Sequence, residues 1–278
     1  MKKFWKLTSM VSALAILVAA PLGSAATTVM VTPSNKQGWK AYGKDDGSVA
    51  YVEDPTVGDG FGAAVLQLKT GNTVTSQAGY YHEVGKSYSQ LPSLSYMAKT
   101  LSANTPVENS AQPNPGGSAG MTLFTDLNGD GTFDTSLVYE PYLSDGSTSN
   151  EPVLPNEWQS WNVMTGSVWS SRAYDSAAMK IEKGTGGSTL YKLSDVLSAY
   201  PSAKLMGVAL NVGTYNPGYT VNVDAVTLGD VVYDFQRQSE VSKLKDECKD
   251  GGWKELQTAE GQTFKNQGGC VSYFTELN

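Results

Sequence analysis

Short stretches in which apolar and polar residues alternate recur along most of the chain. In the clearest of them, residues 219–228, valines alternate with the polar residues Asn222 and Asp224, which predicts a strand with one buried and one exposed face. Clusters of Gly, Pro, Asn and Asp separate these stretches at the spacing typical of β-sandwiches and barrels. The pattern predicts an all-β protein with strands at 48–53, 63–69, 94–100, 121–125, 136–140, 158–163, 178–182, 205–212, 219–228 and 231–235.

Helices play a small part in this pattern. One is predicted over 194–200, where Ser194 is a suitable N-cap and Pro201 ends the helix. A second is predicted over 239–249. The stretches 110–120 and 144–155 are rich in Gly, Pro, Ser and Asn and are expected to be loops.

The first 26 residues have the pattern of a secretory signal peptide. Three lysines near the start precede an apolar run at 10–20, Pro21 ends that run, and small residues at 23–26 offer a cleavage site. The alternative is an N-terminal anchor that is not cleaved. No second apolar run approaches the roughly 20 residues of a membrane span. We therefore expect a protein that is secreted or held at the cell surface.

Charge and composition exclude several classes of function. The chain has 278 residues and a net charge of −7, and losing the three lysines of the signal peptide leaves 17 basic against 27 acidic side chains, a charge of −10. Such an acidic chain does not suit a nucleic-acid binder that works by neutralising phosphates. His82 is the sole histidine, which excludes most zinc sites and most Ser-His or Cys-His catalysis.

Both cysteines lie in the last part of the chain. An even number of cysteines in a secreted protein predicts a disulfide, here Cys248–Cys270, while a pair of free thiols is the alternative. After residue 237 the sequence becomes more polar and richer in lysine. We therefore divide the chain into a signal peptide at 1–26, a β domain at 27–237 and a small disulfide-closed C-terminal segment at 238–278.

The sharpest chemical motif is DLNGDGTFD at 126–134. Oxygen-bearing residues at every second position with a glycine at the turn are typical of a loop that holds Ca²⁺. Strands rather than helices flank this loop, so it is not an EF-hand, and an acidic hairpin loop without an ion is the alternative. The predicted ligands of a structural Ca²⁺ are Asp126, Asn128, Asp130, Thr132 and Asp134.

Three tryptophans, Trp158, Trp161 and Trp169, are candidates for stacking on sugar rings. Trp158 and Trp161 are three residues apart, so on a strand they would point to opposite faces, and core packing is the alternative for each of them. A glycosidase would need two carboxylates across a cleft. The candidates by residue type alone are Glu140, Glu151, Glu157 and Asp224, and no compact pattern of paired carboxylates is present. We therefore predict no catalytic residues.

Several segments resemble a family of secreted bacterial proteins with a β-jelly-roll domain of uncertain role. The matching segments include YVEDPTVGDGFGAAVLQL at 51–68, DLNGDGTFDTSLVYEPYL at 126–143 and VNVDAVTLGDVVYDF at 221–235. The last of these is also similar to the final strands of jelly-roll carbohydrate-binding modules, which implies glycan binding and makes Asp224 a second, weaker Ca²⁺ candidate. The tail resembles a segment, CKxGGW followed by FxNQGxCVSY, that recurs at the ends of secreted bacterial proteins.

These observations favour a secreted, non-enzymatic binding protein on a β-jelly-roll sandwich, with polysaccharide as the expected partner and Ca²⁺ as a structural ion. A structural or adhesive protein of the cell envelope is the second hypothesis. A carbohydrate-active enzyme is the third.

Overall fold

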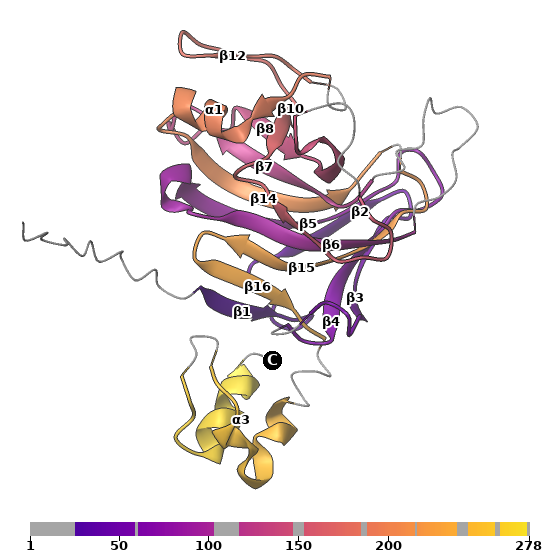
Figure 1. Cartoon of the computed structure of the whole chain (residues 1–278), viewed down its shortest axis with the longest axis vertical. Coiled ribbons are helices and arrows are strands. Elements are labelled where there is room, and N and C mark those ends of the chain that lie inside the picture. Colours follow the sequence, from indigo (N-terminus) through magenta and orange to yellow (C-terminus); the bar gives the residue numbers. More distant parts are fainter. Residues whose placement is uncertain are drawn as a thin grey trace, which may run out of the picture.

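Two seven-stranded β-sheets pack face to face in this computed structural model, which describes residues 26–58, 61–102, 117–146, 153–184, 188–214, 216–237, 244–258 and 262–276 (Figure 1). Residues 1–25 lie outside the described part, so the predicted signal peptide stays a prediction. Sheet A contains β1 (Thr27–Val31), β3 (Ser48–Glu53), β4 (Ala64–Lys69), β6 (Leu94–Ser102), β9 (Gln159–Asn162), β15 (Thr220–Leu228) and β16 (Val231–Phe235). Sheet B contains β2 (Lys40–Lys44), β5 (Gln77–Ser87), β7 (Gly120–Asp126), β8 (Thr135–Tyr139), β10 (Ser167–Ser170), β13 (Tyr191–Lys192) and β14 (Lys204–Val212).

Strand β15 is the centre of sheet A. It pairs with β6 along one edge, while β4 and β16 share its other edge, and all these pairs are antiparallel. Strand β1 adds to the outer side of β16 as a parallel neighbour. Sheet B runs in the order β13-β10-β8-β7-β14-β5-β2. A separate hairpin of β11 (Tyr174–Asp175) and β12 (Lys180–Ile181) projects beside it.

The core lies between the two sheets and is made mainly of Leu, Val and aromatic side chains. Near β1 and β16, the buried Trp39 ring stacks on Tyr80 at a centroid distance of 5.4 Å and meets Phe235 edge-on. Burial of such large side chains is the main stabilising contribution to a sandwich of this kind. The prediction of an all-β jelly-roll sandwich with a short helix and a disulfide-closed C-terminal segment is confirmed.

The strand predictions missed β1, β2, β5, β10, β11 and β13, and they wrongly assigned an exposed face to β15. The eleven-residue strand β5 was not predicted, because its sequence, QAGYYHEVGKS, has no sustained alternation. The prediction that β15 has one exposed face is wrong, since Asn222 and Asp224 are both buried. Asn222 is covered by side chains on the outer face of sheet A, and Asp224 turns toward β16 at an irregularity in the β15–β6 pairing.

Helix α1 (Leu193–Ala199) confirms the helix predicted near 194–200, but its start was misassigned. The N-cap is Lys192, without a side-chain cap, so Ser194 is not the N-cap. The buried Leu193 anchors the first turn directly after β13, and this packing fixes the start of the helix. The second predicted helix is seen in part, as a helical turn at 244–247, and the loop prediction at 110–120 lies largely outside the described residues.

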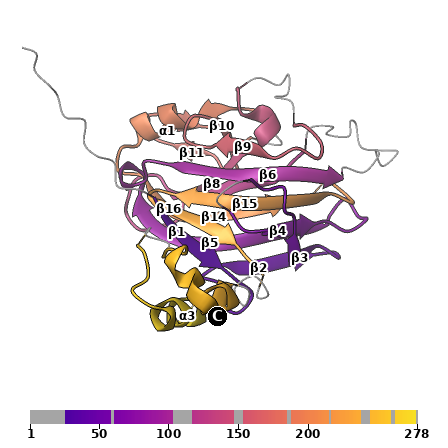
Figure 2. The same ribbon diagram turned by 60° about the horizontal axis from the view of Figure 1, so that its bottom comes forward.

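The C-terminal segment forms a small unit below β1 (Figures 1 and 2). It contains η3 (Lys249–Lys254) and α3 (Gln267–Glu276), and the Cys248–Cys270 disulfide predicted from the sequence joins them, with a Cα–Cα distance of 5.8 Å. The disulfide and Phe274 form a buried cluster separate from the main core, and Met30 of β1 packs against it. No helix in the described part of the chain is long and apolar enough to cross a membrane.

Candidate functional site

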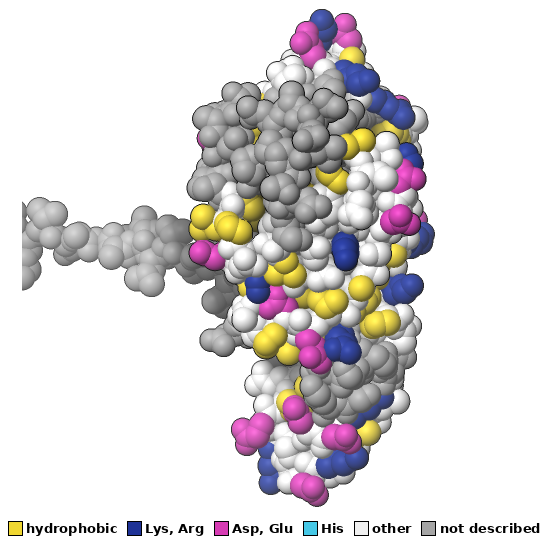
Figure 3. Space-filling view, turned by 90° about the vertical axis from the view of Figure 1, so that its right-hand side faces the viewer, with side chains coloured by type: hydrophobic (Ala, Val, Ile, Leu, Met, Phe, Trp, Pro, Cys, Tyr) yellow, Lys and Arg dark blue, Asp and Glu magenta, His cyan; other side chains and the backbone are white. Residues whose placement is uncertain are grey.

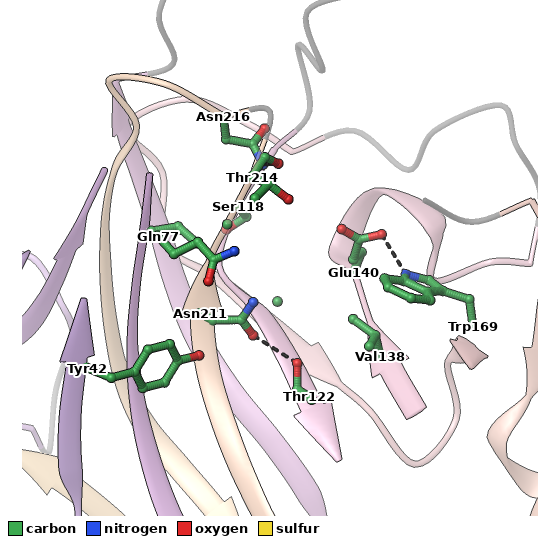
Figure 4. A pocket seen from close by; sticks show the side chains of 13 residues that line it. Tyr42, Gln77, Ser118, Thr122, Val138, Glu140, Trp169, Asn211, Thr214 and Asn216 are labelled. Atoms are coloured by element: carbon green, nitrogen blue, oxygen red, sulfur yellow. Dashed lines mark hydrogen bonds between the residues drawn. The ribbon is translucent and has the colours of Figure 1, made fainter. Parts of the chain in front are cut away.

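A trough lies on the outer face of sheet B and brings together residues from six strands (Figure 4). Strands β2 and β5 supply one side, β14 and β7 supply the floor, and β8 and β10 supply the other side. The residues lining this trough are Tyr42, Gln77, Ser118, Gly120, Thr122, Val138, Glu140, Trp169, Asn211, Val212, Gly213, Thr214 and Asn216.

Glycines open the floor of the trough. Strand register places Gly79, Asn211 and Gly120 in one row across β5, β14 and β7. Tyr42 pairs with Gly79, and its ring lies across that glycine, since a Cβ atom at Gly79 would stand 2.2 Å from the ring carbon Cζ. Tyr42 is 41% exposed and so presents an aromatic surface to solvent at the side of the trough.

The floor between the walls is polar. The Thr122 hydroxyl donates to Asn211 Oδ1 at 3.0 Å, which leaves the Asn211 amide nitrogen directed to the trough (Figure 4). Gln77 adds a second carboxamide on the Tyr42 side. Ser118 Oγ is buried and has no hydrogen-bond partner among the described residues. Amides and hydroxyls around an aromatic ring are the groups that recognise a ligand with many hydroxyls and apolar C–H faces.

The opposite wall is held by a partly buried hydrogen bond. Trp169 donates its indole N–H to Glu140 Oε2 at 2.8 Å, and the Tyr142 hydroxyl donates to the same oxygen at 3.2 Å. Burial raises the pKa of Glu140, while these two hydrogen bonds act in the opposite direction. The bonds fix the Trp169 ring at the edge of the trough, where it is half-buried.

The three predicted tryptophans are not brought together. Trp169 lines the trough, whereas Trp161 is 6% exposed and belongs to the core, where it offers no face to a ligand. Trp158 precedes β9 of sheet A and is half-buried. Sequence reasoning missed Tyr42, because its importance depends on Gly79, which lies 37 positions away and becomes its neighbour only through strand pairing.

A second aromatic group continues the same face beyond the trough. The Tyr81 ring lies across Gly207, where an added Cβ would be 2.7 Å from the ring. Tyr81 meets Phe124 edge-on at 5.5 Å, and Phe124 contacts Phe133 at 6.1 Å. The guanidinium of Arg172 lies 4.8 Å from the centre of the Phe133 ring. The outer face of sheet B thus carries aromatic surface over more than the trough itself.

The loop at 126–134 folds around its own backbone. Asp126 accepts the N–H groups of Gly129 and Gly131 at 2.6 and 2.7 Å, and Asp134 accepts the N–H of Leu127 at 2.7 Å. Within the described residues, no three His, Cys, Asp or Glu side chains are grouped closely enough to surround a metal ion. The five ligands predicted there are Asp126, Asn128, Asp130, Thr132 and Asp134, and a Ca²⁺ ion in this loop stays a prediction.

The weaker Ca²⁺ candidate, Asp224, lies in a different environment. Its Oδ1 accepts the N–H groups of Ala225 and Phe235 at 2.8 and 2.9 Å, while its Oδ2 is buried without a hydrogen-bond partner among the described residues. Burial, and then repulsion from the neighbouring buried Asp234, raise the pKa of Asp224 well above its usual value. Gln236 donates to Asp234, and its own Oε1 is buried and unpaired within the described structure.

These oxygens suit a cation. No described lysine or arginine forms a salt bridge with Asp224 or Asp234, so burial favours the uncharged form of both carboxyl groups, and a bound cation would favour their ionised form. Carboxylate and amide oxygens are the ligands that Ca²⁺ prefers. Asp224 Oδ2 and Gln236 Oε1 therefore offer oxygens without a hydrogen-bond partner in the described structure, and a Ca²⁺ ion at Asp224 stays a prediction, as it does in the loop.

Comparisons with known proteins give loose similarities of fold. No family model matches the chain, and no curated protein matches it. The family 11 carbohydrate-binding module of the cellulase Lic26A-Cel5E from Clostridium thermocellum is 13% identical over 70% of this chain and 89% of its own, with a TM-score of 0.37. The C-terminal family 22 carbohydrate-binding module of Xyn10B from Clostridium thermocellum is 11% identical over 69% of this chain and 87% of its own, with a TM-score of 0.32.

An enzyme is also among the similar structures. A β-1,2-glucanase from Parabacteroides distasonis is 13% identical over 69% of this chain and 23% of its own, with a TM-score of 0.36. None of these similarities is strong enough to carry a ligand or an activity over to this chain.

Proposed function

We propose that this protein binds polysaccharide, without catalysing its turnover, in the trough on the outer face of sheet B. The observation that carries the proposal is the exposed Tyr42 ring laid over Gly79 beside the carboxamides of Gln77 and Asn211. A sugar ring offers an apolar C–H face to an aromatic ring and hydroxyls to amides.

A binding role rather than catalysis is supported by the acidic groups of the trough. Glu140 is the one carboxylate among the described residues that line it, and it already accepts hydrogen bonds from Trp169 and Tyr142. Glycoside hydrolysis generally uses two carboxylates on opposite sides of the scissile bond. We assign Glu140 the role of holding the Trp169 ring.

We propose further that the protein acts outside the cytoplasm and is stabilised by Ca²⁺. The Cys248–Cys270 disulfide supports the first point, because disulfides persist in oxidising compartments. The unpaired oxygens at Asp224 and Gln236 support the second. A bound Ca²⁺ would supply positive charge to Asp224 and Asp234, and Asp224 links β15 to β16 by accepting the Phe235 N–H. The loop at 126–134 is the second location for such an ion.

Retention on insoluble polysaccharides and cell-wall preparations, measured in calcium buffer, tests the binding proposal. We expect selective retention on at least one polymer, at least tenfold weaker binding for Tyr42→Ala, and little change for Tyr42→Phe, which keeps the ring. Val74→Ala is a matched control, because Val74 is 37% exposed and lies outside the trough. Retention that Tyr42→Ala and Val74→Ala reduce equally would contradict the assignment of the trough.

A structural or adhesive role in the cell envelope is the second candidate. The observation that favours it is the C-terminal unit, which has its own buried cluster around the disulfide. Deleting residues 239–278 should release the protein from the cell surface if this unit anchors it. Unchanged surface attachment after the deletion would count against the second candidate and leave the first untouched.

A further inference from the structure

Three polar residues form a row across the outer face of sheet A, on the opposite side of the molecule's core from the trough. Strand pairing places Lys99 of β6 directly opposite Asn222 of β15, and Asn222 directly opposite Gln67 of β4. Figure 2 shows these three strands side by side. Directly paired residues on one face have Cβ atoms about 5 Å apart, so the long Lys99 side chain easily reaches the Asn222 carboxamide.

A carboxylate joins the ends of these two side chains. Asp54, directly after β3, accepts a hydrogen bond from Lys99 Nζ at 3.0 Å and from Asn222 Nδ2 at 2.8 Å, both on its Oδ2 atom. The lysine nitrogen and the amide nitrogen therefore share one hydrogen-bond acceptor, so the distance between them cannot exceed the sum of these two hydrogen-bond lengths. On the other side, Gln67 Nε2 donates to Asn222 Oδ1 at 3.0 Å.

This group is shielded from solvent. Asn222 is 2% exposed, and the side chains of Lys99 and Asp54 are 12% and 8% exposed. The Lys99 ammonium is further held by the Thr56 hydroxyl, which accepts from Nζ at 2.9 Å. Enclosing an amine, a carboxylate and a carboxamide together costs more desolvation than three apolar residues would, so stability alone gives little reason for this set.

We propose that Lys99 and Asn222 form an intramolecular isopeptide bond, with Asp54 as the proton-transfer group. Asp54 takes a proton from the Lys99 ammonium, and the free amine attacks Cγ of Asn222. The C–N bond to the Asn222 side-chain nitrogen breaks as Asp54 returns this proton to that nitrogen. The Lys99 nitrogen gives up its second proton as the new amide forms, and the released ammonia carries this proton away as ammonium. One amide replaces another, so the reaction needs no oxidant, metal or cofactor.

The surrounding groups match the needs of each step. Burial would raise the pKa of Asp54, but hydrogen bonds from Thr56, Asn222 and Lys99 lower it overall, so its carboxylate is ionised. Its Oδ2 lies between the Lys99 nitrogen and the Asn222 side-chain nitrogen, which places it to carry a proton from one to the other. The Gln67 N–H directed at Asn222 Oδ1 stabilises negative charge on that oxygen during attack, as donors in an oxyanion hole do. Holding the amine beside the carboxamide replaces a bimolecular encounter with a reaction between fixed neighbours.

Intact-mass measurement of the purified, reduced protein tests the proposal. We expect a mass lower than that of the mature sequence by one ammonia, about 17 Da, and a cross-linked peptide pair that joins Lys99 to Asn222 after digestion. The full sequence mass in the wild-type protein would overturn the proposal, and this result does not depend on any variant folding.

Variants assign the roles. Lys99→Arg keeps the positive charge but removes the nucleophile, so it should regain the full sequence mass. Asp54→Asn should also regain it, because the proton acceptor is lost. Lys69→Arg is the matched control on the exposed side of β4 and should keep the mass deficit. A deficit that persists in Lys99→Arg, or that maps to another peptide, would refute the assignment.

Discussion

Removal of calcium should make the stability of the sandwich depend steeply on pH, because of the buried carboxylates on β15 and β16. Burial raises the pKa of Asp234 to about 6, against an ordinary value of 3.8. Its protonated form is therefore favoured in the folded protein, and the associated stability is complete below the unfolded pKa and lost as pH rises through 6. A shift of about two pKa units corresponds to about 3 kcal/mol of unfolding free energy.

The measurement is urea unfolding at pH 4, 5, 6 and 7 in calcium-stripped buffer, compared with the Asp234→Asn variant. Other groups titrate in this range, among them Glu140 with its raised pKa and His82, whose pKa is lowered by burial. These contributions are shared by both proteins, so the difference between the two curves reports Asp234 together with its repulsion of Asp224. We expect wild type to lose about 2 kcal/mol relative to the variant between pH 4 and pH 7, because pH 4 already lies above the unfolded pKa of 3.8.

Adding Ca²⁺ should reverse this loss. An ion that binds the two ionised carboxylates stabilises the folded state by about 2.7 kcal/mol at a hundred times its dissociation constant. The reasoning fails if the wild-type and variant curves run parallel without calcium. The assignment of a calcium site fails if millimolar Ca²⁺ leaves the unfolding free energy of wild type at pH 7 unchanged. It also fails if Ca²⁺ stabilises the Asp224→Asn variant as strongly as wild type.

Three further expectations concern the trough, the C-terminal unit and the acidic loop. Gly79→Ala should weaken polysaccharide retention about as much as Tyr42→Ala, because the added Cβ displaces the Tyr42 ring. The melting temperature should change little, since that ring is flexible and no backbone has to move, and retention equal to wild type would contradict this expectation. Reducing the disulfide, which spans 22 positions, should destabilise the C-terminal unit by about 3 kcal/mol and leave the unfolding transition of the sandwich unchanged. Hydrogen exchange measures the two units separately, and a simultaneous loss of protection in both would contradict this expectation. Asp126→Ala should lower the unfolding free energy by about 2 kcal/mol, and with it the melting temperature, even without calcium, because two backbone N–H groups lose their acceptor. An unchanged melting temperature would show that the loop does not depend on these hydrogen bonds.

The strands that alternate clearly were predictable, and the site was predictable only in part. The valines of β15 identify it as a strand, but its polar residues were assigned to an exposed face. Asn222 and Asp224 are instead buried, because Asp54 covers one and β16 binds the other. Asp54 lies more than 150 positions from Asn222, and Phe235 of β16 lies about 10 positions from Asp224. The periodicity of a single strand does not reveal contacts with such residues.

The same limit applies to the trough. Trp169 was identified by residue type, and its partner Glu140 by charge, but their hydrogen bond depends on the pairing of β8 with β10. Tyr42 and Asn211 come from strands that had no distinguishing motif. The surface colouring of Figure 3 shows acidic and basic side chains interspersed on one face, so charge gave no indication of where a ligand would bind there.

The parallel pairing of β1 with β16 has a mechanical consequence. Thr27 lies opposite Val231 and Val31 opposite Phe235, so the chain enters β1 at one end of the pair and leaves β16 at the other. A pull between the N-terminal side of Thr27 and the C-terminal unit therefore acts along the two strands in opposite directions. All the hydrogen bonds between them share that load at once, instead of opening one after another. Such a load would separate β1 from β16 only when this whole strand pair slides.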